Sequence, residues 1–255
     1  MIDREAILRM SNLTKSFEGL KVVDLESIEI VSGRITGLIG PNGAGKTTIF
    51  NLISGLLRPD RGEIWFEDRR IDTLPPWEIA RMGIGRLFQD IRIFRKLSVL
   101  DNILLGDPNH PGENPLNLFL DYRNIIRIER KNLKETEYWI EFVGLKGKEK
   151  SPAGSLSFGQ QKLLAIARLI SGGHKLLLLD EPTAGVNPMM IKQILSLIER
   201  IAKEGKTVLF IEHNMNVVLE IADWVYFLDE GRVTSFGRPQ EVLGDPEVRK
   251  MYLGL

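Results

Sequence analysis

The stretch that most constrains the fold is a glycine-rich segment between two apolar patterns. Gly40-Pro41-Asn42-Gly43-Ala44-Gly45-Lys46-Thr47-Thr48 follows the apolar run Arg34 to Ile39 and precedes the helical pattern Ile49 to Leu57. It fits G-x-x-x-x-G-K-S/T, with the strand before it and the helix after it that this pattern needs. The glycines let the backbone turn its N–H groups inward, and the helix adds its positive N-terminal end. The segment therefore predicts a strand-to-helix turn that binds phosphate, the alternative being a turn without a ligand.

Two side chains at the end of this turn have predicted roles. Lys46 would neutralise the outer phosphates, and the Thr47 hydroxyl would hold a Mg²⁺ ion. The pattern alone indicates a nucleoside triphosphate, so the reaction has to be inferred from the rest of the chain.

Composition excludes several classes of protein. The 255 residues suffice for one large or two small domains, and 34 basic residues balance 34 acidic ones, which argues against a nucleic-acid binder. The absence of cysteine excludes disulfides, thiolate metal sites and a catalytic thiol, and suits a reducing cytoplasm. The charged start Met1 to Glu5 is unlike a signal peptide, and no run of about eighteen apolar residues occurs. We expect a protein that serves a membrane, if at all, from its surface.

Two carboxylates follow a short, unbroken apolar run. The run Lys175 to Leu179 ends in Asp180 and Glu181. Such a run predicts a parallel strand buried on both faces, which places the carboxylates at its C-terminal end, on the side of the phosphate turn. Asp180 would support Mg²⁺, and Glu181 would accept a proton from an attacking water. The alternative is a pair of acids in a surface turn.

Gln89 and His213 end two further strand patterns, Gly83 to Asp90 and Thr207 to Ile211. In open α/β sheets, ligands lie outside the carboxyl ends of the strands. An amide there can touch a metal or a water, and an imidazole can bridge a terminal phosphate and a carboxylate. Alone, each would be interpreted as a surface residue; the position of His213 favours a functional role.

The stretch Ser155 to Gln161 opens a predicted helix, Gln161 to Ile170. Ser157 is the expected N-cap, and Gln160 completes a capping box. The capping box accounts for Ser157 and Gln160 but not for Gly159. A small residue at a helix start lets an anion approach the backbone N–H groups. The stretch is therefore either a cap alone or a second phosphate site.

The remaining segments predict the organisation of the domains. Phe17 lies on a predicted polar connection, Asn12 to Leu20, either as a ring that caps the core or as a face for a nucleotide base. Strands on either side of the phosphate turn suggest a small antiparallel layer. Residues 106–118 are expected to form a loop and Phe119 to Val143 a charged amphipathic helix. We expect an α-helical subdomain at 91–171, inserted into a sheet domain formed by 1–90 and 172–255.

In this order, the segments resemble the motifs of ATP-binding cassette (ABC) ATPases, over nearly the whole chain. The matching motifs are the phosphate loop, the Q-loop Gln89, the signature Leu156 to Gln160, the Walker B strand to Asp180, the catalytic glutamate Glu181, the D-loop Ala184 to Asn187, the switch histidine His213 and the adenine-stacking Phe17. The resemblance implies a P-loop NTPase of the ABC type, with a mixed central sheet, an antiparallel β layer and an inserted α-helical subdomain.

The resemblance also assigns roles to residues. It implies that ATP and Mg²⁺ are the cofactors and that a water attacks the γ-phosphate in line. The catalytic residues would be Glu181, His213, Gln89 and Lys46, and the metal ligands Thr47, Gln89 and Asp180. The nucleotide would be bound by Phe17, Gly40, Pro41, Asn42, Gly43, Ala44, Gly45, Lys46, Thr47 and Thr48, and by Ser157, Gly159 and Gln160 of a partner subunit.

The implied partners follow from the same family. A head-to-tail dimer would hold two ATP molecules, either as a homodimer or as a heterodimer with a second ABC ATPase subunit. Transmembrane permease subunits would anchor the pair at the cytoplasmic face of the cell membrane, and an extracellular or periplasmic substrate-binding protein would act through them. No nucleic acid is expected as a partner.

Within the family, the chain is most similar to the ATP-binding subunits of importers for branched-chain amino acids (leucine, isoleucine, valine). The similarity lies in Phe158 with Gln160-Gln161, in the loop Gly112 to Asn117, and in the ending Asp245 to Gly254. Phe158 replaces the glycine more usual in the signature. The same ATPase could instead serve lipopolysaccharide export or urea uptake. A soluble cassette ATPase acting on DNA, ribosomes or iron–sulfur assembly would usually carry coiled-coil insertions, paired cassettes or basic arms, and none is seen. The signature argues against a P-loop kinase or GTPase, and the Asn-Lys-x-Asp base reader of a GTPase is absent.

Overall fold

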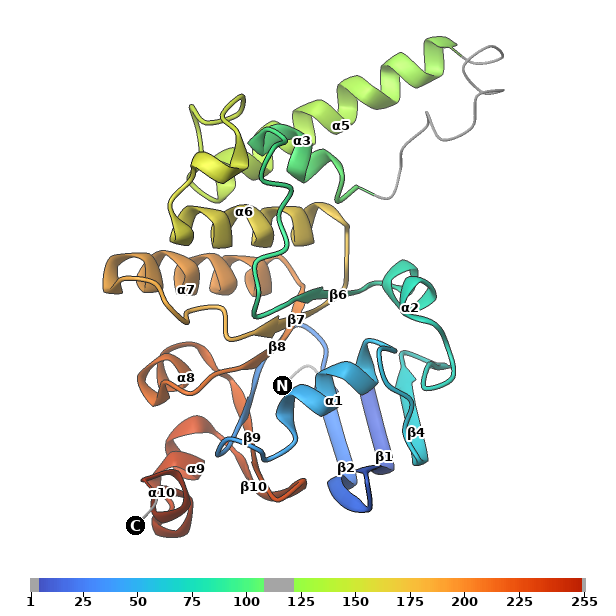
Figure 1. Cartoon of the computed structure of the whole chain (residues 1–255), viewed down its shortest axis with the longest axis vertical. Helices are drawn as coiled ribbons and strands as arrows, with labels where there is room; N and C mark the ends of the chain where they lie inside the picture. The colour runs from blue at the N-terminus through green and yellow to red at the C-terminus, as the bar shows by residue number, and fades with distance from the viewer. Residues whose placement is uncertain (1–4, 108–121, 254–255) are drawn as a thin grey trace. The chain divides into compact units, whose positions relative to one another are not determined.

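A computed structural model describes the backbone of residues 5–107 and 122–253. These residues form two compact units, shown in Figure 1 and described separately below. The first comprises the described parts of Met1–Gln89, Lys175–Gly185 and Ile191–Leu255, and the second those of Asp90–His174 and Val186–Met190. Most of the predicted loop 106–118, the stretch Gly112 to Asn117, the predicted helix start at Phe119 and the terminal Gly254 lie outside the described residues.

One sheet of the first unit is antiparallel. Its strands, in the order β2-β1-β4-β5, are β1 (Ala6–Phe17), β2 (Leu20–Val31), β4 (Arg61–Phe66) and β5 (Arg69–Arg70). The predicted connection over Asn12 to Leu20 is wrong, because β1 continues to Phe17. Leu13 is fully buried opposite Leu25 of β2, so the apolar alternation extends past the polar residues. The actual turn is Glu18-Gly19, whose positive φ values of 49° and 87° suit a two-residue hairpin.

The second sheet has six strands among the described residues, in the order β10-β9-β3-β8-β7-β6. Neighbouring strands are parallel except β9 and β10, which form an antiparallel hairpin at one edge. The bounds are β3 (Ile35–Ile39), β6 (Ile84–Leu87), β7 (Leu176–Asp180), β8 (Thr207–Ile211), β9 (Trp224–Asp229) and β10 (Arg232–Gly237). All five residues of β3, β7 and β8 are buried, as expected for parallel strands covered on both faces. The mixed sheet and the antiparallel layer confirm the predicted fold class.

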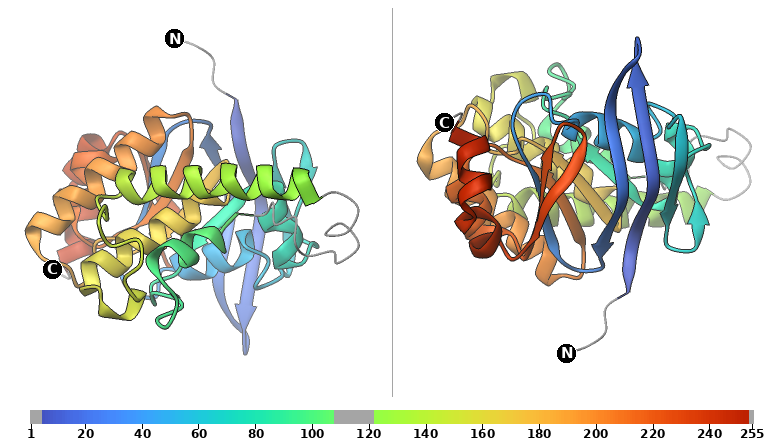
Figure 2. Two further views of the ribbon diagram at one scale, coloured as in Figure 1. Left: turned by 90° about the horizontal axis from the view of Figure 1, so that it is seen from above. Right: turned by 90° about the horizontal axis from the view of Figure 1, so that it is seen from below.

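The core of the first unit is built around α1 (Lys46–Ile53). Its Phe50 and Ile53 are fully buried in a cluster with Ile64 of the antiparallel layer and Leu209 of the parallel sheet. The helix begins three residues before the predicted Ile49 because it starts directly after the glycine turn. The strands β2 and β10 lie side by side (Figure 2). The other helices are α2 (Pro76–Met82), α8 (Met215–Ile221), α9 (Pro239–Gly244) and α10 (Pro246–Leu253), with α7 (Pro188–Lys203) beginning in the second unit and continuing in the first.

The second unit is helical in its described residues. It contains α3 (Val99–Leu104), α5 (Tyr122–Phe142), the short 3-10 helix η2 (Ala153–Ser155) and α6 (Phe158–Ser171). The helices α3, α5 and α6 pack on one another (Figure 2) and bury Ile103, Ile140 and Ile166. None of the described helices combines the length and apolar composition that crossing a bilayer requires.

Candidate active site

The turn between β3 and α1 has the backbone that its glycines predict. Gly40, Gly43 and Gly45 all have positive φ, at 145°, 85° and 92°. At Gly45 a Cβ atom would also lie 2.5 Å from the carbonyl oxygen of Val22, so no other residue fits without a shift of the backbone. The turn is thus fixed both by its own conformation and by the strand beside it.

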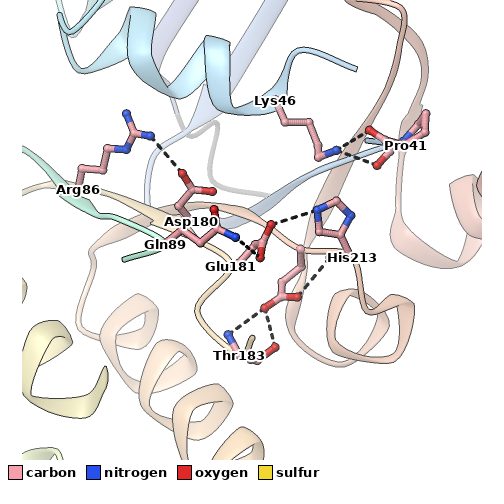
Figure 3. Close-up of polar contacts among 10 residues, drawn as sticks. Pro41, Lys46, Arg86, Gln89, Asp180, Glu181, Thr183 and His213 are labelled. Atoms are coloured by element: carbon pink, nitrogen blue, oxygen red, sulfur yellow. Dashed lines mark hydrogen bonds and ion pairs between the residues drawn. The ribbon is translucent and has the colours of Figure 1, made fainter. Parts of the chain in front are cut away.

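Lys46 begins α1 and places a cation inside this turn. Its side chain is buried, with 6% of the residue exposed, and Nζ donates to the carbonyl oxygens of Gly40 at 2.8 Å and Pro41 at 2.7 Å (Figure 3). Burial lowers the pKa of Lys46, and the carboxylates of Glu181 and Asp180 oppose that shift. A charged group held by two weak acceptors is well suited to exchange them for phosphate oxygens.

The carboxyl ends of β6, β7 and β8 bring three predicted residues together. The strands are parallel neighbours in register, so the residues that follow them meet at one edge of the sheet. Glu181 Oε2 accepts a hydrogen bond from Gln89 Nε2 at 3.0 Å, and Glu181 Oε1 lies 3.2 Å from His213 Nε2 (Figure 3). Glu181 itself has a φ of 48°, a left-handed conformation that side chains rarely adopt and that clusters at functional sites.

Asp180 is engaged by a residue that the sequence did not single out. Arg86 of β6 donates from Nη2 to Asp180 Oδ2 at 3.1 Å and from Nη1 to Asn51 and Ser54 of α1, at 2.7 and 3.0 Å. Both side chains of the pair are 6% exposed. Burial raises the pKa of Asp180, whereas the hydrogen bond and charge of Arg86 oppose the shift. A charged residue inside the apolar pattern Ile84 to Leu87 was the available sequence signal.

The guanidinium of Arg86 also lies over aromatic rings. Its carbon is 4.7 Å from the ring centroid of Phe88 and 5.6 Å from that of Phe50. Arg86 thereby joins the helix after the phosphate turn, the end of β7 and the segment that leads to Gln89.

The predicted metal ligands offer oxygen atoms. Thr47 supplies a hydroxyl, Gln89 an amide and Asp180 a carboxylate whose Oδ1 accepts no hydrogen bond from any described residue. Hard cations such as Mg²⁺ prefer such donors and usually keep only one or two protein carboxylates, completing their shell with phosphate and water. Within 5–107 and 122–253 there is no group of three or more His, Cys, Asp or Glu suited to a metal. The donor set therefore fits Mg²⁺ held jointly with a phosphate.

Glu212 is a second residue that the sequence did not single out. It follows β8 directly, is 3% exposed, and accepts hydrogen bonds at Oε1 from the backbone N–H and the hydroxyl of Thr183, at 3.0 and 2.6 Å. Its Oε2 accepts from the backbone N–H of His213 at 3.3 Å. The carboxylate thus connects the segment after Glu181 with the segment that carries His213.

Phe17 ends β1 and is 42% exposed, which is too open for a ring that caps the core. The Nζ atom of Lys15 lies 5.6 Å from the ring centroid. The exposed ring remains available as a flat apolar surface.

Ser157, Gly159 and Gln160 lie in the second unit, where they begin α6. The predicted capping box is present: Ser157 Oγ accepts from the N–H of Gln160 at 3.4 Å, and Gln160 Oε1 accepts from the N–H of Ser157 at 3.2 Å. Gly159 has a packing reason as well, since a Cβ there would lie 2.7 Å from Cγ of Met190. The helix therefore begins at Phe158, three residues before the predicted start, because Ser157 is its N-cap.

Comparison with known proteins assigns the family. A family model described as ABC transporter matches residues 24–184. The chain is 36% identical to the high-affinity branched-chain amino acid transport ATP-binding protein BraF of Pseudomonas aeruginosa, over 97% of this chain and 98% of that protein. It is 38% identical to the probable branched-chain amino acid transport ATP-binding protein LivG of Methanocaldococcus jannaschii, over the whole of both chains.

Solved structures agree with the sequence relatives. The crystal structure of a nucleotide-free ATP-binding cassette from an ABC transporter superposes with a TM-score of 0.84 at 37% identity, covering 98% of this chain and 100% of that one. A cassette in its ADP conformation gives a TM-score of 0.85 at 36% identity with the same coverage. The chain therefore belongs to the ABC transporter family, as one of its ATP-binding proteins.

Proposed function

We propose that this chain is the ATP-hydrolysing subunit of an importer for branched-chain amino acids. The observation that carries the proposal is the carboxylate of Glu181, which contacts both Gln89 and His213 at the carboxyl edge of the parallel sheet. A base fixed at both oxygens and placed beside a phosphate turn is suited to activate a water molecule. The names of the sequence relatives support the choice of branched-chain amino acids as the transported class.

The chemistry is hydrolysis at the terminal phosphate of ATP. The oxygen of a water attacks the γ-phosphorus while the bond from phosphorus to the leaving ADP oxygen breaks, and Glu181 accepts the proton of the water. Gln89 and His213 hold the carboxylate, and Lys46 exchanges its carbonyl partners for phosphate oxygens to offset the charge that develops. Mg²⁺, when bound through Thr47, Gln89 and Asp180, would supply a further positive charge to the phosphates.

The two compact units would have different roles in binding ATP. The first unit would be the nucleotide-binding core, and the second, carrying Ser157 and Gly159, the helical subdomain that reaches the nucleotide of a partner subunit. At the start of α6 the N–H groups of Phe158 and Gly159 have no hydrogen bond to any described residue, which supports a role in binding an anion. Complete sites would then form only in a dimer of this chain with itself or with a second ATPase subunit.

Transport would require partners at the membrane. Permease subunits would hold the dimer at the cytoplasmic face, and a binding protein on the other side would deliver the amino acid. Gln89 is the last residue of its segment of the first unit, and Asp90 begins the second unit. The backbone to Gln89 and the hydrogen bond from Gln89 to Glu181 therefore connect the second unit to the base.

The proposal is tested with the complete transporter in lipid vesicles. Leucine, isoleucine or valine, with the binding protein, should stimulate release of phosphate and enter the vesicles, whereas urea should do neither. Glu181→Gln should retain ATP binding and lose hydrolysis by about 100-fold or more. Stimulation by urea alone would overturn the transported class, and full turnover by Glu181→Gln would remove Glu181 as the base.

A further inference from the structure

We infer that Glu212 is a positioning residue for hydrolysis: its buried carboxylate sets the spacing between the segments that carry Glu181 and His213. This inference rests on the proposed function, because it concerns how the base and the switch histidine are held. Neither Glu212 nor Thr183 touches the reacting atoms in this scheme.

The geometry gives Glu212 three donors from two segments. Both donors of Thr183 converge on Oε1, at 3.0 and 2.6 Å, and Thr183 stands two residues after Glu181. The N–H of His213 donates to the other oxygen, Oε2, at 3.3 Å. One rigid carboxylate therefore connects the end of β7 with the end of β8.

A purely packing role would not favour this residue. A carboxylate that is 3% exposed has lost most of its contact with water, which is unfavourable unless its hydrogen bonds are satisfied. An apolar side chain would fill the same space without that penalty. All three donors belong to the two segments that hold Glu181 and His213, so what the carboxylate adds is a fixed distance between them.

That distance matters because it sets the contact between His213 and Glu181. His213 Nε2 lies 3.2 Å from Glu181 Oε1, near the upper limit for a hydrogen bond. Misplacement of a catalytic group by about 1 Å can reduce turnover by about 100-fold. The segment from Glu181 to Thr183 includes Pro182, whose ring fixes the backbone dihedral φ. A displacement of Thr183 should therefore also displace Glu181.

The test uses two variants and a matched control. Glu212→Gln keeps the shape but turns one acceptor into a donor, so either orientation of the amide loses a bond from a backbone N–H, that of His213 or that of Thr183. Thr183→Val removes only the hydroxyl donor at 2.6 Å, and Thr183→Ser retains it as the control. We expect kcat to fall about 10-fold or more in Glu212→Gln and Thr183→Val, with the Kd for ATP changed less than twofold, and Thr183→Ser to keep most of the activity.

A double-mutant cycle separates positioning from general damage. If Glu212 acts through His213, Glu212→Gln should lower turnover in the native background and add little in a His213→Ala background. Equal fold losses in both backgrounds would overturn the inference, as would a loss of ATP affinity that matches the loss of kcat. Should Glu212→Gln fail to fold, the same double-mutant cycle with His213→Ala can be measured with Thr183→Val. If His213→Ala and Glu181→Gln themselves leave turnover intact, the proposed roles of His213 and Glu181 in hydrolysis fail, and this outcome is distinct from failure of the positioning role.

Discussion

Removing the charge of Arg86 should destabilise the first unit strongly. Arg86→Met leaves Asp180 as a buried carboxylate without its counter-ion, since both side chains are 6% exposed and 3.1 Å apart. Breaking one side of a buried pair in this way costs about 3–5 kcal/mol. The bonds from Arg86 to Asn51 and Ser54 are lost as well, but methionine can keep packing against the rings of Phe50 and Phe88. We therefore expect a loss of about 4 kcal/mol.

The expected loss is measurable as a change in melting temperature. For a protein of this size 1 kcal/mol corresponds to about 2–4 °C, so Arg86→Met should lower Tm by about 8–16 °C. Circular dichroism and tryptophan fluorescence should be followed together, because two compact units need not unfold in one step. Arg86→Lys, which keeps the charge and loses the planar fork, should fall between the native protein and Arg86→Met.

Repeating the substitution in an Asp180→Asn variant isolates the ionic part of the loss in stability. In Asp180→Asn no negative charge is left behind, so Arg86→Met should cost clearly less there than in the native chain. A fall in Tm below about 3 °C for Arg86→Met, or an equal fall in both backgrounds, would refute the role of Arg86 as the counter-ion of Asp180.

Three further predictions concern other parts of the chain. Gly45→Ala should lower Tm more than Gly43→Ala, because both positions have positive φ but only Gly45 faces a backbone oxygen, whereas a Cβ at Gly43 meets nothing within 4 Å; equal effects would contradict the steric argument. Ser157→Arg should suppress the turnover of native subunits when the two are mixed, by blocking the site across the interface, and strict proportionality to the native fraction would argue against shared sites. Burial raises the pKa of Asp72, but the guanidinium of Arg70 and a backbone N–H lower it more, so the net pKa lies below its usual value of about 4. The stabilisation by Asp72 is thus complete above that value and lost as the pH falls through the folded pKa. Urea titrations should show Asp72→Asn about 1–3 kcal/mol less stable than the native protein at pH 7, and this difference should shrink as the pH falls below the usual carboxyl pKa.

The sequence predicted the buried parallel strands and the phosphate turn because their signals are local. An unbroken apolar run such as Leu176–Leu179 has few alternatives to an interior strand, and the glycine pattern is specific. Boundaries were less accurate. Both α1 and α6 begin three residues before their predicted starts. Each starts directly after its N-cap, Gly45 or Ser157, and not where the apolar period becomes regular. The polar residues after Asn12 concealed the continuation of β1, which depends on pairing with β2.

Some residues of the site, too, could be predicted from the sequence and others could not. Gln89, Glu181 and His213 could be predicted to meet because each follows a strand, and parallel strands align their ends. Arg86 and Glu212 could not, because what matters is the partner of each, and the partners lie 94 and 29 residues away in the sequence. Local patterns contain no information about which distant side chain neutralises a buried charge.

The exposed ring of Phe17 has a consequence for which nucleoside triphosphate the protein binds. A stacking surface is satisfied by the flat face of a purine and does not distinguish the groups along its edge, which differ between adenine and guanine. If the base rests on Phe17, the protein would select strongly for the triphosphate and weakly for the base. The relative abundance of nucleotides in the cell would then decide which one drives the transporter.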